Sequence, residues 1–109
     1  MKTTLLFLSV FLSVSLFGQN VYIPDANFKA HLVGNSAINT NSDTEIQVSE
    51  ASAFDGGIIC ESLSIWDLTG IEAFTALDSL NCSSNWIQSF LIDISQNTAL
   101  TYLNYANNA

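Results

Sequence analysis

Apolar positions recur at a fixed spacing in the second half of the chain. Segments 77–85 and 100–108 both carry leucine at their first and fourth positions, a soft or large apolar residue at the sixth and asparagine at the ninth. The second segment begins 23 residues after the first. These positions are Leu77, Leu80, Cys82 and Asn85, and then Leu100, Leu103, Tyr105 and Asn108. Because alternate side chains of a strand point to opposite faces, the pattern predicts a short strand with an inward apolar face, followed by a turn.

A repeat of about 20–29 residues with this order of leucines and asparagine is typical of leucine-rich repeats. The predicted fold class is a leucine-rich-repeat solenoid of about three rungs, with short parallel strands joined by mainly irregular return segments. The first rung is less regular. Ile58 and Cys60 occupy its inward positions, but Leu63 replaces the asparagine. Terminal repeats are often atypical in this way.

The recurring asparagines have a structural interpretation. Asn85 and Asn108 stand where the chain leaves the strand. Their amides can hydrogen-bond the backbone of the turn and of the neighbouring rung, where an apolar residue would leave those groups unpaired. The alternative is that each asparagine is a simple turn former. Their identical offsets in the repeat favour the first interpretation.

The two cysteines are also one repeat apart. Cys60 and Cys82 are separated by 22 residues, so we expect them on adjacent rungs. Neighbouring strands about 4.8 Å apart would permit a disulfide bond. However, both cysteines occupy inward positions, and a buried reduced cysteine behaves as a small apolar residue. A reduced cysteine ladder is therefore the favoured interpretation.

The segment before the repeats predicts a small helical cap. Pro24 is suited to the first position of a helix of about ten residues, with Phe28 and Leu32 on one face and Gly34 at its end. A second short helix is expected at residues 50–54, with Ser49 as its N-cap. The predicted organisation is a signal peptide at 1–18, a cap region at 19–55 and leucine-rich repeats at 56–109.

A polar loop between the two predicted helices has the spacing of an EF-hand calcium loop. Its oxygen-bearing residues are Asn39, Asn41, Asp43, Glu45 and Glu50. These stand at loop positions 1, 3, 5, 7 and 12, which supply ligands in EF-hands. Asn at position 1 and Thr44 at position 6 depart from that pattern. The alternative to Ca²⁺ binding is an Asx-rich loop whose side chains hydrogen-bond their own backbone.

Residues 1–18 have the layout of a secretory signal peptide. A basic start precedes an apolar run from Leu5 to Phe17, and the chain turns polar at Gly18. Thirteen residues are too short to span a bilayer, and nothing downstream is apolar enough to do so. The predicted cleavage lies between Gly18 and Gln19. A buried helix or an uncleaved anchor is the alternative.

The predicted mature chain is strongly acidic. The whole chain has a formal net charge of −8, and removal of Lys2 with the signal peptide makes it −9. A surface of this sign repels phosphate groups and anionic lipids, which argues against nucleic-acid binding and membrane-surface binding. The composition is equally expected for solubility of an exported protein.

Residues suited to catalysis are few. His31 is the single histidine, and no serine lies in a G-x-S-x-G motif. Trp66 and Trp86 follow the strands of successive rungs, either as exposed contacts for a protein or glycan or as packing over the edge of the core. We favour packing, because large aromatic side chains are usually buried.

Several motifs together resemble the secreted leucine-rich-repeat proteins of Bacteroidetes bacteria. They are residues 23–30 (IPDANFKA), 45–51 (EIQVSEA), 67–74 (DLTGIEAF) and 95–100 (SQNTAL). The resemblance implies an exported or cell-surface protein, often delivered by type IX secretion, with a role in interaction rather than catalysis. Segment 90–93 is longer than the compact return of that family and suggests a local bulge. The chain ends at Ala109, without the further repeats and sorting domain of the family, which suggests an N-terminal fragment.

The favoured function is therefore a non-enzymatic module at the bacterial surface that binds a protein or a glycan. Its expected contacts are the outward strand positions Asp78, Ser79, Asn81, Thr101, Tyr102 and Asn104. The alternative is the N-terminal accessory region of a larger secreted hydrolase. Sequence beyond Ala109 would distinguish them, since repeats favour the first hypothesis and a catalytic motif the second.

Overall fold

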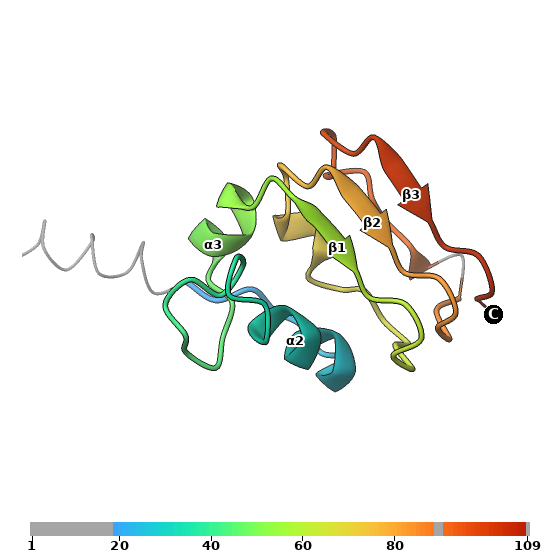
Figure 1. Ribbon diagram of the computed structural model, residues 1–109, viewed down its shortest axis with the longest axis horizontal. Helices are drawn as coiled ribbons and strands as arrows, with labels where there is room; N and C mark the ends of the chain where they lie inside the picture. The colour runs from blue at the N-terminus through green and yellow to red at the C-terminus, as the bar shows by residue number, and fades with distance from the viewer. Residues whose placement is uncertain (1–18, 89–90, 109) are drawn as a thin grey trace, which may run out of the picture.

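The computed structural model describes residues 19–88 and 91–108. The predicted signal peptide, and Phe90 of the predicted bulge, lie outside the described residues. The element order along the chain is α2 (Ala26–Val33), α3 (Val48–Ala53), β1 (Gly57–Ile59), the 3₁₀ helix η1 (Ile71–Ala73), β2 (Ser79–Asn81) and β3 (Tyr102–Asn104) (Figure 1).

The three strands form a parallel sheet in the order β1-β2-β3. Ile58 aligns with Leu80, and Leu80 aligns with Leu103. This register confirms the predicted correspondence between the irregular first rung and the second. Each strand has only three residues, as expected where one inward residue per strand faces the core. The arrangement is leucine-rich-repeat-like.

One hydrophobic core joins the cap to the repeats. Phe28 and Leu32 of α2 are fully buried, as the predicted apolar stripe requires, and they belong to the same cluster as Ile58 and Leu80. The rings of Phe54 and Phe74 meet edge to face with their centroids 6.4 Å apart. The helices therefore cover the β1 side of the sheet and share its core (Figure 1).

Both helices begin at positions other than those predicted. α2 begins at Ala26, because the Asp25 carboxylate accepts hydrogen bonds from the backbone N–H groups of Asn27 and Phe28. Pro24 therefore precedes the N-cap, and α2 has eight residues rather than ten. It ends at Gly34, as predicted.

α3 begins at Val48 with Gln47 as its N-cap, so the prediction of Ser49 as the cap is wrong. The Glu50 carboxylate accepts a hydrogen bond from the Gln47 N–H at 2.9 Å, which fixes the start of the helix two residues earlier than expected.

The return segment of the first rung contains η1, which the sequence analysis did not predict. Gly70 precedes this helix with φ +110°. A Cβ atom at this position would lie 2.7 Å from Ile23 Cγ1 and 3.1 Å from the Tyr22 carbonyl oxygen. Glycine is required here, because the N-terminal extended segment packs directly against the return.

The turns after the strands share one backbone conformation. Ser62, Ser84 and Asn107 have φ near +57° and stand at equivalent repeat positions. A left-handed residue at each rung reverses the chain so that the next residues can run back behind the sheet. No helix in the described part of the chain is long and apolar enough to cross a membrane.

Candidate functional site

Four of the six predicted outward residues, Ser79, Asn81, Tyr102 and Asn104, lie in β2 and β3, and the other two, Asp78 and Thr101, directly precede these strands. Asp78, Thr101 and Tyr102 are exposed, whereas Ser79, Asn81 and Asn104 are half-buried. The register places Ser79 beside Tyr102 and Asn81 beside Asn104. The Thr101 hydroxyl donates to the Asp78 carboxylate at 3.1 Å, which links the entrances of two rungs.

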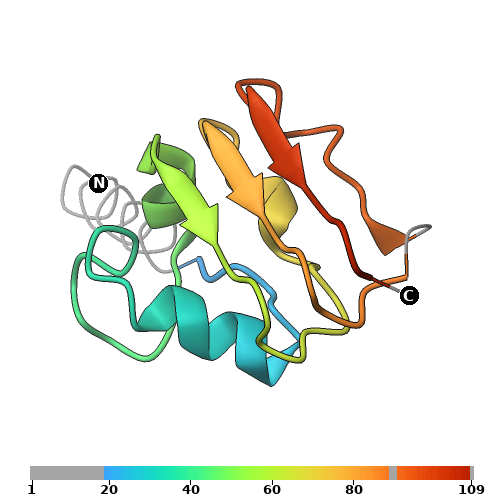
Figure 2. The same cartoon turned by 45° about the vertical axis from the view of Figure 1, so that its right-hand side comes forward.

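Two further residues on this surface were missed by the sequence analysis. Ile59 aligns with Asn81 and is 64% exposed, although it is an aliphatic residue. The Glu61 carboxylate accepts from the amide of Asn81 at 3.3 Å and from the Ser83 hydroxyl at 3.4 Å. The alignment of Ile58 with Leu80 was the signal that could have identified Ile59. We call the six predicted residues, together with Ile59 and Glu61, the strand face. The three strands that carry most of it lie side by side (Figure 2).

Asn85 lies beneath the turns and connects two rungs. Its amide nitrogen donates to the carbonyl oxygens of Cys60 (2.8 Å), Cys82 (3.0 Å) and Ser83 (3.2 Å). Its side-chain oxygen accepts from the N–H groups of Leu63 and Ile65, both at 3.0 Å. The residue is 3% exposed, so these bonds satisfy backbone groups that water does not reach.

Asn108 repeats this arrangement one rung later. Its amide nitrogen donates to the carbonyl oxygens of Cys82 and Tyr105, and its side-chain oxygen accepts from the N–H group of Ile87. Another asparagine, Asn97, is buried but was not singled out as structural. It donates to the carbonyl oxygens of Ile71 and Phe74 at 2.9 Å and so ties the two return segments together.

The remaining structural positions fall into two groups. Leu77, Leu80, Cys60 and Cys82 are fully buried. Leu100 and Leu103 are half-buried, and Tyr105 is 50% exposed. Leu103 and Tyr105, together with Ile92 and Ile94, line a pocket of about 220 Å³ beside β3. Tyr105 therefore differs from the buried cysteines whose repeat position it shares.

Both cysteines are free and buried, in agreement with the favoured reduced ladder. Burial, followed by the neighbouring Cys82, raises the pKa of Cys60 to about 12. Burial also raises the pKa of Cys82. Each thiol is therefore neutral at physiological pH, and neither has the thiolate character of a nucleophile.

We expect both thiols to resist alkylation in the folded protein at pH 8 and to react fully after unfolding. Folding raises the pKa of Cys60 from 9.0 to about 12. The thiol therefore loses its proton near pH 9 in the unfolded chain but only near pH 12 in the folded chain. Stability is thus retained below pH 9 and decreases as pH rises towards 12. Mass spectrometry after iodoacetamide treatment measures the reaction. Alkylation of the native protein at the rate of a free thiol would contradict the assignment.

Apart from the buried Oδ1 of Asn39, which has no hydrogen-bond partner among the described residues, the side-chain oxygen atoms of the predicted calcium loop accept hydrogen bonds from protein donors. Asn39 is buried and donates to the carbonyl oxygens of Val33 and Asp43. The Asp43 carboxylate accepts from the backbone of Glu45 and from the amides of Asn41 and Gln47. These bonds, led by the Glu45 N–H, hold the pKa of Asp43 below its usual value.

The two glutamates of this loop are directed to different partners. Glu45 forms an ion pair with Lys29, in which both carboxylate oxygens lie 2.8 Å from Nζ. Glu50 is buried and accepts from the backbone of Thr40, Asn41 and Gln47. In the described ranges, no three histidine, cysteine or acidic side chains are grouped to hold a metal ion. Calcium binding stays a prediction from the loop spacing.

Asp25 attaches the cap to the first rung. Its Oδ1 caps α2, while its Oδ2 accepts from the backbone N–H of Trp66 at 2.8 Å and from that of Asp67 at 3.3 Å. One carboxylate therefore holds two segments that are 41 residues apart in the sequence.

We expect Asp25→Ala to lower the free energy of unfolding by about 2 kcal/mol, because one helix cap and two further acceptor contacts are lost. Asp25→Asn is the matched control. Its amide oxygen can still cap α2, so we expect about half the loss. Urea denaturation measures both. Equal losses in the two variants would indicate that the helix cap contributes nothing.

The two tryptophans pack on each other rather than into the core. Trp66 is 56% exposed and Trp86 is 53% exposed, and their rings meet at 4.8 Å with an interplanar angle of 70°. The favoured prediction, that both tryptophans pack over the edge of the core, is therefore wrong, because each side chain is more than half exposed. The repeat spacing concealed this contact, because the two residues occupy different positions in their rungs. His31 is half-buried in the last turn of α2.

Comparisons with known proteins identify similar chains. No protein-family model matches the chain. Over 80 residues the chain is 37% identical to Internalin J of Listeria monocytogenes serotype 4b (strain F2365), a match that covers 72% of this chain and 8% of Internalin J. The chain thus corresponds to a small part of that relative.

Two solved structures have a similar fold. The functional domain of InlJ from Listeria monocytogenes, which includes a cysteine ladder, matches with a TM-score of 0.68 and 36% identity, over 84% of this chain and 20% of that chain. The CBM51-2 and INT domains of Clostridium perfringens ZmpB match with a TM-score of 0.60 and 20% identity, over 80% of this chain and 17% of that chain. The second likeness concerns the fold alone.

These findings agree with a leucine-rich-repeat-like chain similar to Internalin J. The adjacent buried cysteines, Cys60 and Cys82, fit the cysteine ladder named for the InlJ domain. The Bacteroidetes type stays a prediction from the sequence motifs.

Proposed function

We propose that the chain is a non-enzymatic recognition module of an exported or cell-surface protein, and that it binds a protein or glycan through the strand face. The observation that carries this proposal is the exposure of Ile59 on β1 and of Tyr102 on β3, the two strands that flank the polar outward side of β2. Isolated exposed apolar residues are common, but here two lie on one sheet surface among hydrogen-bonding side chains.

The geometry supports binding rather than catalysis. The strand face offers amide, hydroxyl and carboxylate groups beside apolar area, which suits recognition of a polar partner. Its acids, Asp78 and Glu61, already accept hydrogen bonds from neighbouring side chains. The free cysteines are buried and neutral, so neither serves as a nucleophile.

The export and the architecture belong to the same proposal. The signal-peptide pattern of residues 1–18 and the similarity to Internalin J support a location outside the cell. The rung register of β1, β2 and β3 supports a leucine-rich-repeat solenoid in which the strand face is one surface of a longer array.

The test is a binding screen of the chain against immobilised extracellular proteins and glycans. For each positive ligand, an Ile59→Ser/Tyr102→Ser variant is compared with the unchanged chain. We expect its affinity to fall at least about tenfold, because two exposed contact residues are removed without disturbing the core.

The control for this screen is Thr75→Ala, a substitution at an exposed position outside the strand face. It is expected to bind like the unchanged chain. Ligands that bind both variants equally well would reject the strand face as the site. A ligand converted to a product would reject the non-enzymatic assignment.

A further inference from the structure

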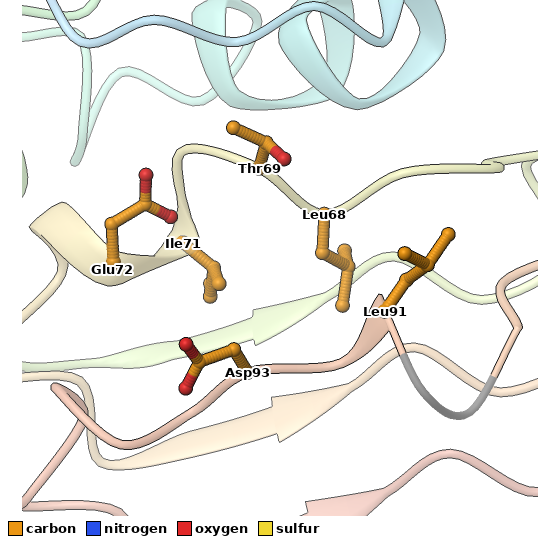
Figure 3. Close-up of a pocket in the computed structure, with 6 residues that line it drawn as sticks. All are labelled: Leu68, Thr69, Ile71, Glu72, Leu91 and Asp93. Carbon is orange, nitrogen blue, oxygen red and sulfur yellow. The ribbon is translucent and has the colours of Figure 1, made fainter.

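A pocket of about 330 Å³ lies between the return segments of the first two rungs, away from the strand face. Its lining residues are Leu68, Thr69, Ile71, Glu72, Leu91 and Asp93, and we call it the return pocket (Figure 3). The first four come from the return that contains η1, and the other two come from the next return. The volume is at the small end of the range for ligand sites.

The return pocket has an apolar part and an acidic part. Leu68 and Leu91 lie together at one end, and the carboxylates of Glu72 and Asp93 lie at the other, with Ile71 between them (Figure 3). Leu91 is 49% exposed, whereas Leu68, one repeat earlier, is 1% exposed. The first return therefore buries its leucine at this repeat position, whereas the second return leaves Leu91 half-exposed at the pocket.

Both carboxylates are held in place by the backbone. Glu72 accepts from the Gly70 N–H at 2.8 Å, and Asp93 accepts from the Ser95 N–H at 3.0 Å. The backbone and side-chain hydrogen bonds from Ser95 hold the pKa of Asp93 below its usual value, so this group is ionised at neutral pH. The pocket thus carries negative charge beside apolar surface.

The described part of the chain supplies no cation to balance these acids. Its one lysine or arginine is Lys29, which is bound to both carboxylate oxygens of Glu45. His31 lies in the last turn of α2 and is not among the residues that line the pocket. The charge of the return pocket is therefore complementary to a partner with positive charge.

We propose that the return pocket binds a lysine or arginine side chain from an extended segment of a partner protein. Such a side chain has an aliphatic stem and a cationic tip. The stem fits the surface between Leu68 and Leu91, and the tip reaches Glu72 and Asp93. A purely apolar ligand would desolvate the carboxylates without pairing them, and an acidic ligand would be repelled.

The test uses short capped peptides with one lysine between glycines, and matched peptides with norleucine or glutamate in its place. An NMR titration of the ¹⁵N-labelled chain locates the contacts. The lysine peptide is expected to shift amide signals of residues 68–72 and 91–93 in a saturable way. The norleucine and glutamate peptides are expected to bind at least about tenfold more weakly.

Two charge-matched variants separate the pocket from general acidity. The double variant Glu72→Gln/Asp93→Asn is expected to lower the affinity for the lysine peptide about tenfold. Glu61→Gln/Asp78→Asn removes the same charge from the strand face and is expected to change the affinity by less than about twofold. Leu91→Asn, at a half-exposed position, is expected to lower the affinity for the lysine peptide about threefold.

Three results would overturn the inference: equal weakening by both charge variants, shifts confined to the strand face, or equal binding of the norleucine peptide. Each leaves the strand-face proposal standing, because that proposal is tested by Ile59 and Tyr102 and does not involve the return pocket.

Discussion

Asn85→Ala is expected to lower the free energy of unfolding by about 4 kcal/mol, the largest effect of a single polar substitution in this chain. The change removes an amide that accepts from Leu63 and Ile65 and donates to Cys60, Cys82 and Ser83. Alanine leaves two buried N–H groups without an acceptor, and each such group costs about 1–3 kcal/mol. Urea denaturation followed by circular dichroism measures the loss.

Asn108→Ala is the control for this prediction, because Asn108 has the same repeat position. Its partners Tyr105 and Ala106 are exposed and can bond to water, and only one backbone N–H group, that of Ile87, loses its acceptor, so we expect a loss of about 1–2 kcal/mol. Asn85→Asp should also be severely destabilising, because a carboxylate would face the carbonyl oxygens of Cys60 and Cys82. A larger loss for Asn108→Ala than for Asn85→Ala would show that burial does not set the cost.

Glu50→Gln is expected to cost about 3 kcal/mol. Glu50 accepts hydrogen bonds from three backbone N–H groups: Oε2 accepts from Thr40 and Asn41, and Oε1 accepts from Gln47. A glutamine can accept through one end only, so its NH₂ group must face an N–H donor. The buried position gives the chain little freedom to avoid this conflict.

Glu45→Gln is the matched variant, since it removes one charge from another predicted calcium ligand. Glu45 forms a partly exposed ion pair with Lys29, and such pairs contribute about 0–1 kcal/mol. Calorimetry in the presence of EDTA compares the two variants. Equal effects would contradict the capping role of Glu50.

The same calorimetry repeated with millimolar Ca²⁺ tests the calcium proposal. If the loop binds Ca²⁺, the melting temperature of the unchanged chain rises, and Glu50→Gln, which removes the bidentate carboxylate of position 12, abolishes the rise. Glu45→Gln keeps the backbone carbonyl that position 7 supplies and is expected to preserve it. Binding requires Asp43 and Glu50 to exchange their backbone donors for the ion. No rise would reject calcium binding and leave the hydrogen-bonded loop as the explanation of the spacing.

Sequence reasoning predicted the sheet better than the helix ends. The correspondence of Ile58 with Leu80 follows from a repeat spacing and a two-residue alternation, both of which are visible in one chain. The ends of α2 and α3 were misplaced because several adjacent residues can serve as caps. Asp25 and Gln47 were chosen by contacts that the local sequence does not specify.

The candidate sites show the same division. The outward positions Ser79, Asn81, Tyr102 and Asn104 follow from the strand pattern, and the register pairs them on neighbouring strands. Their role in binding stays a prediction. Ile59 was missed because the first rung is irregular. The return pocket was not foreseen, since its six residues come from two return segments whose separation no repeat motif determines. The Trp66–Trp86 contact was missed because the two tryptophans occupy different positions in their rungs.

The amino-acid sequence by itself determined the strands, their parallel register and the residues that face inward, because these follow from local alternation and from a repeat of 22 or 23 residues. Only the tertiary structure decided how the polar side chains are used. Asp25 reaches Trp66 across 41 residues, and Glu50 turns back to the backbone of Thr40. A carboxylate can bind a cation, cap a helix or hold a turn, and the choice among these depends on which donors the folded chain brings within about 3 Å.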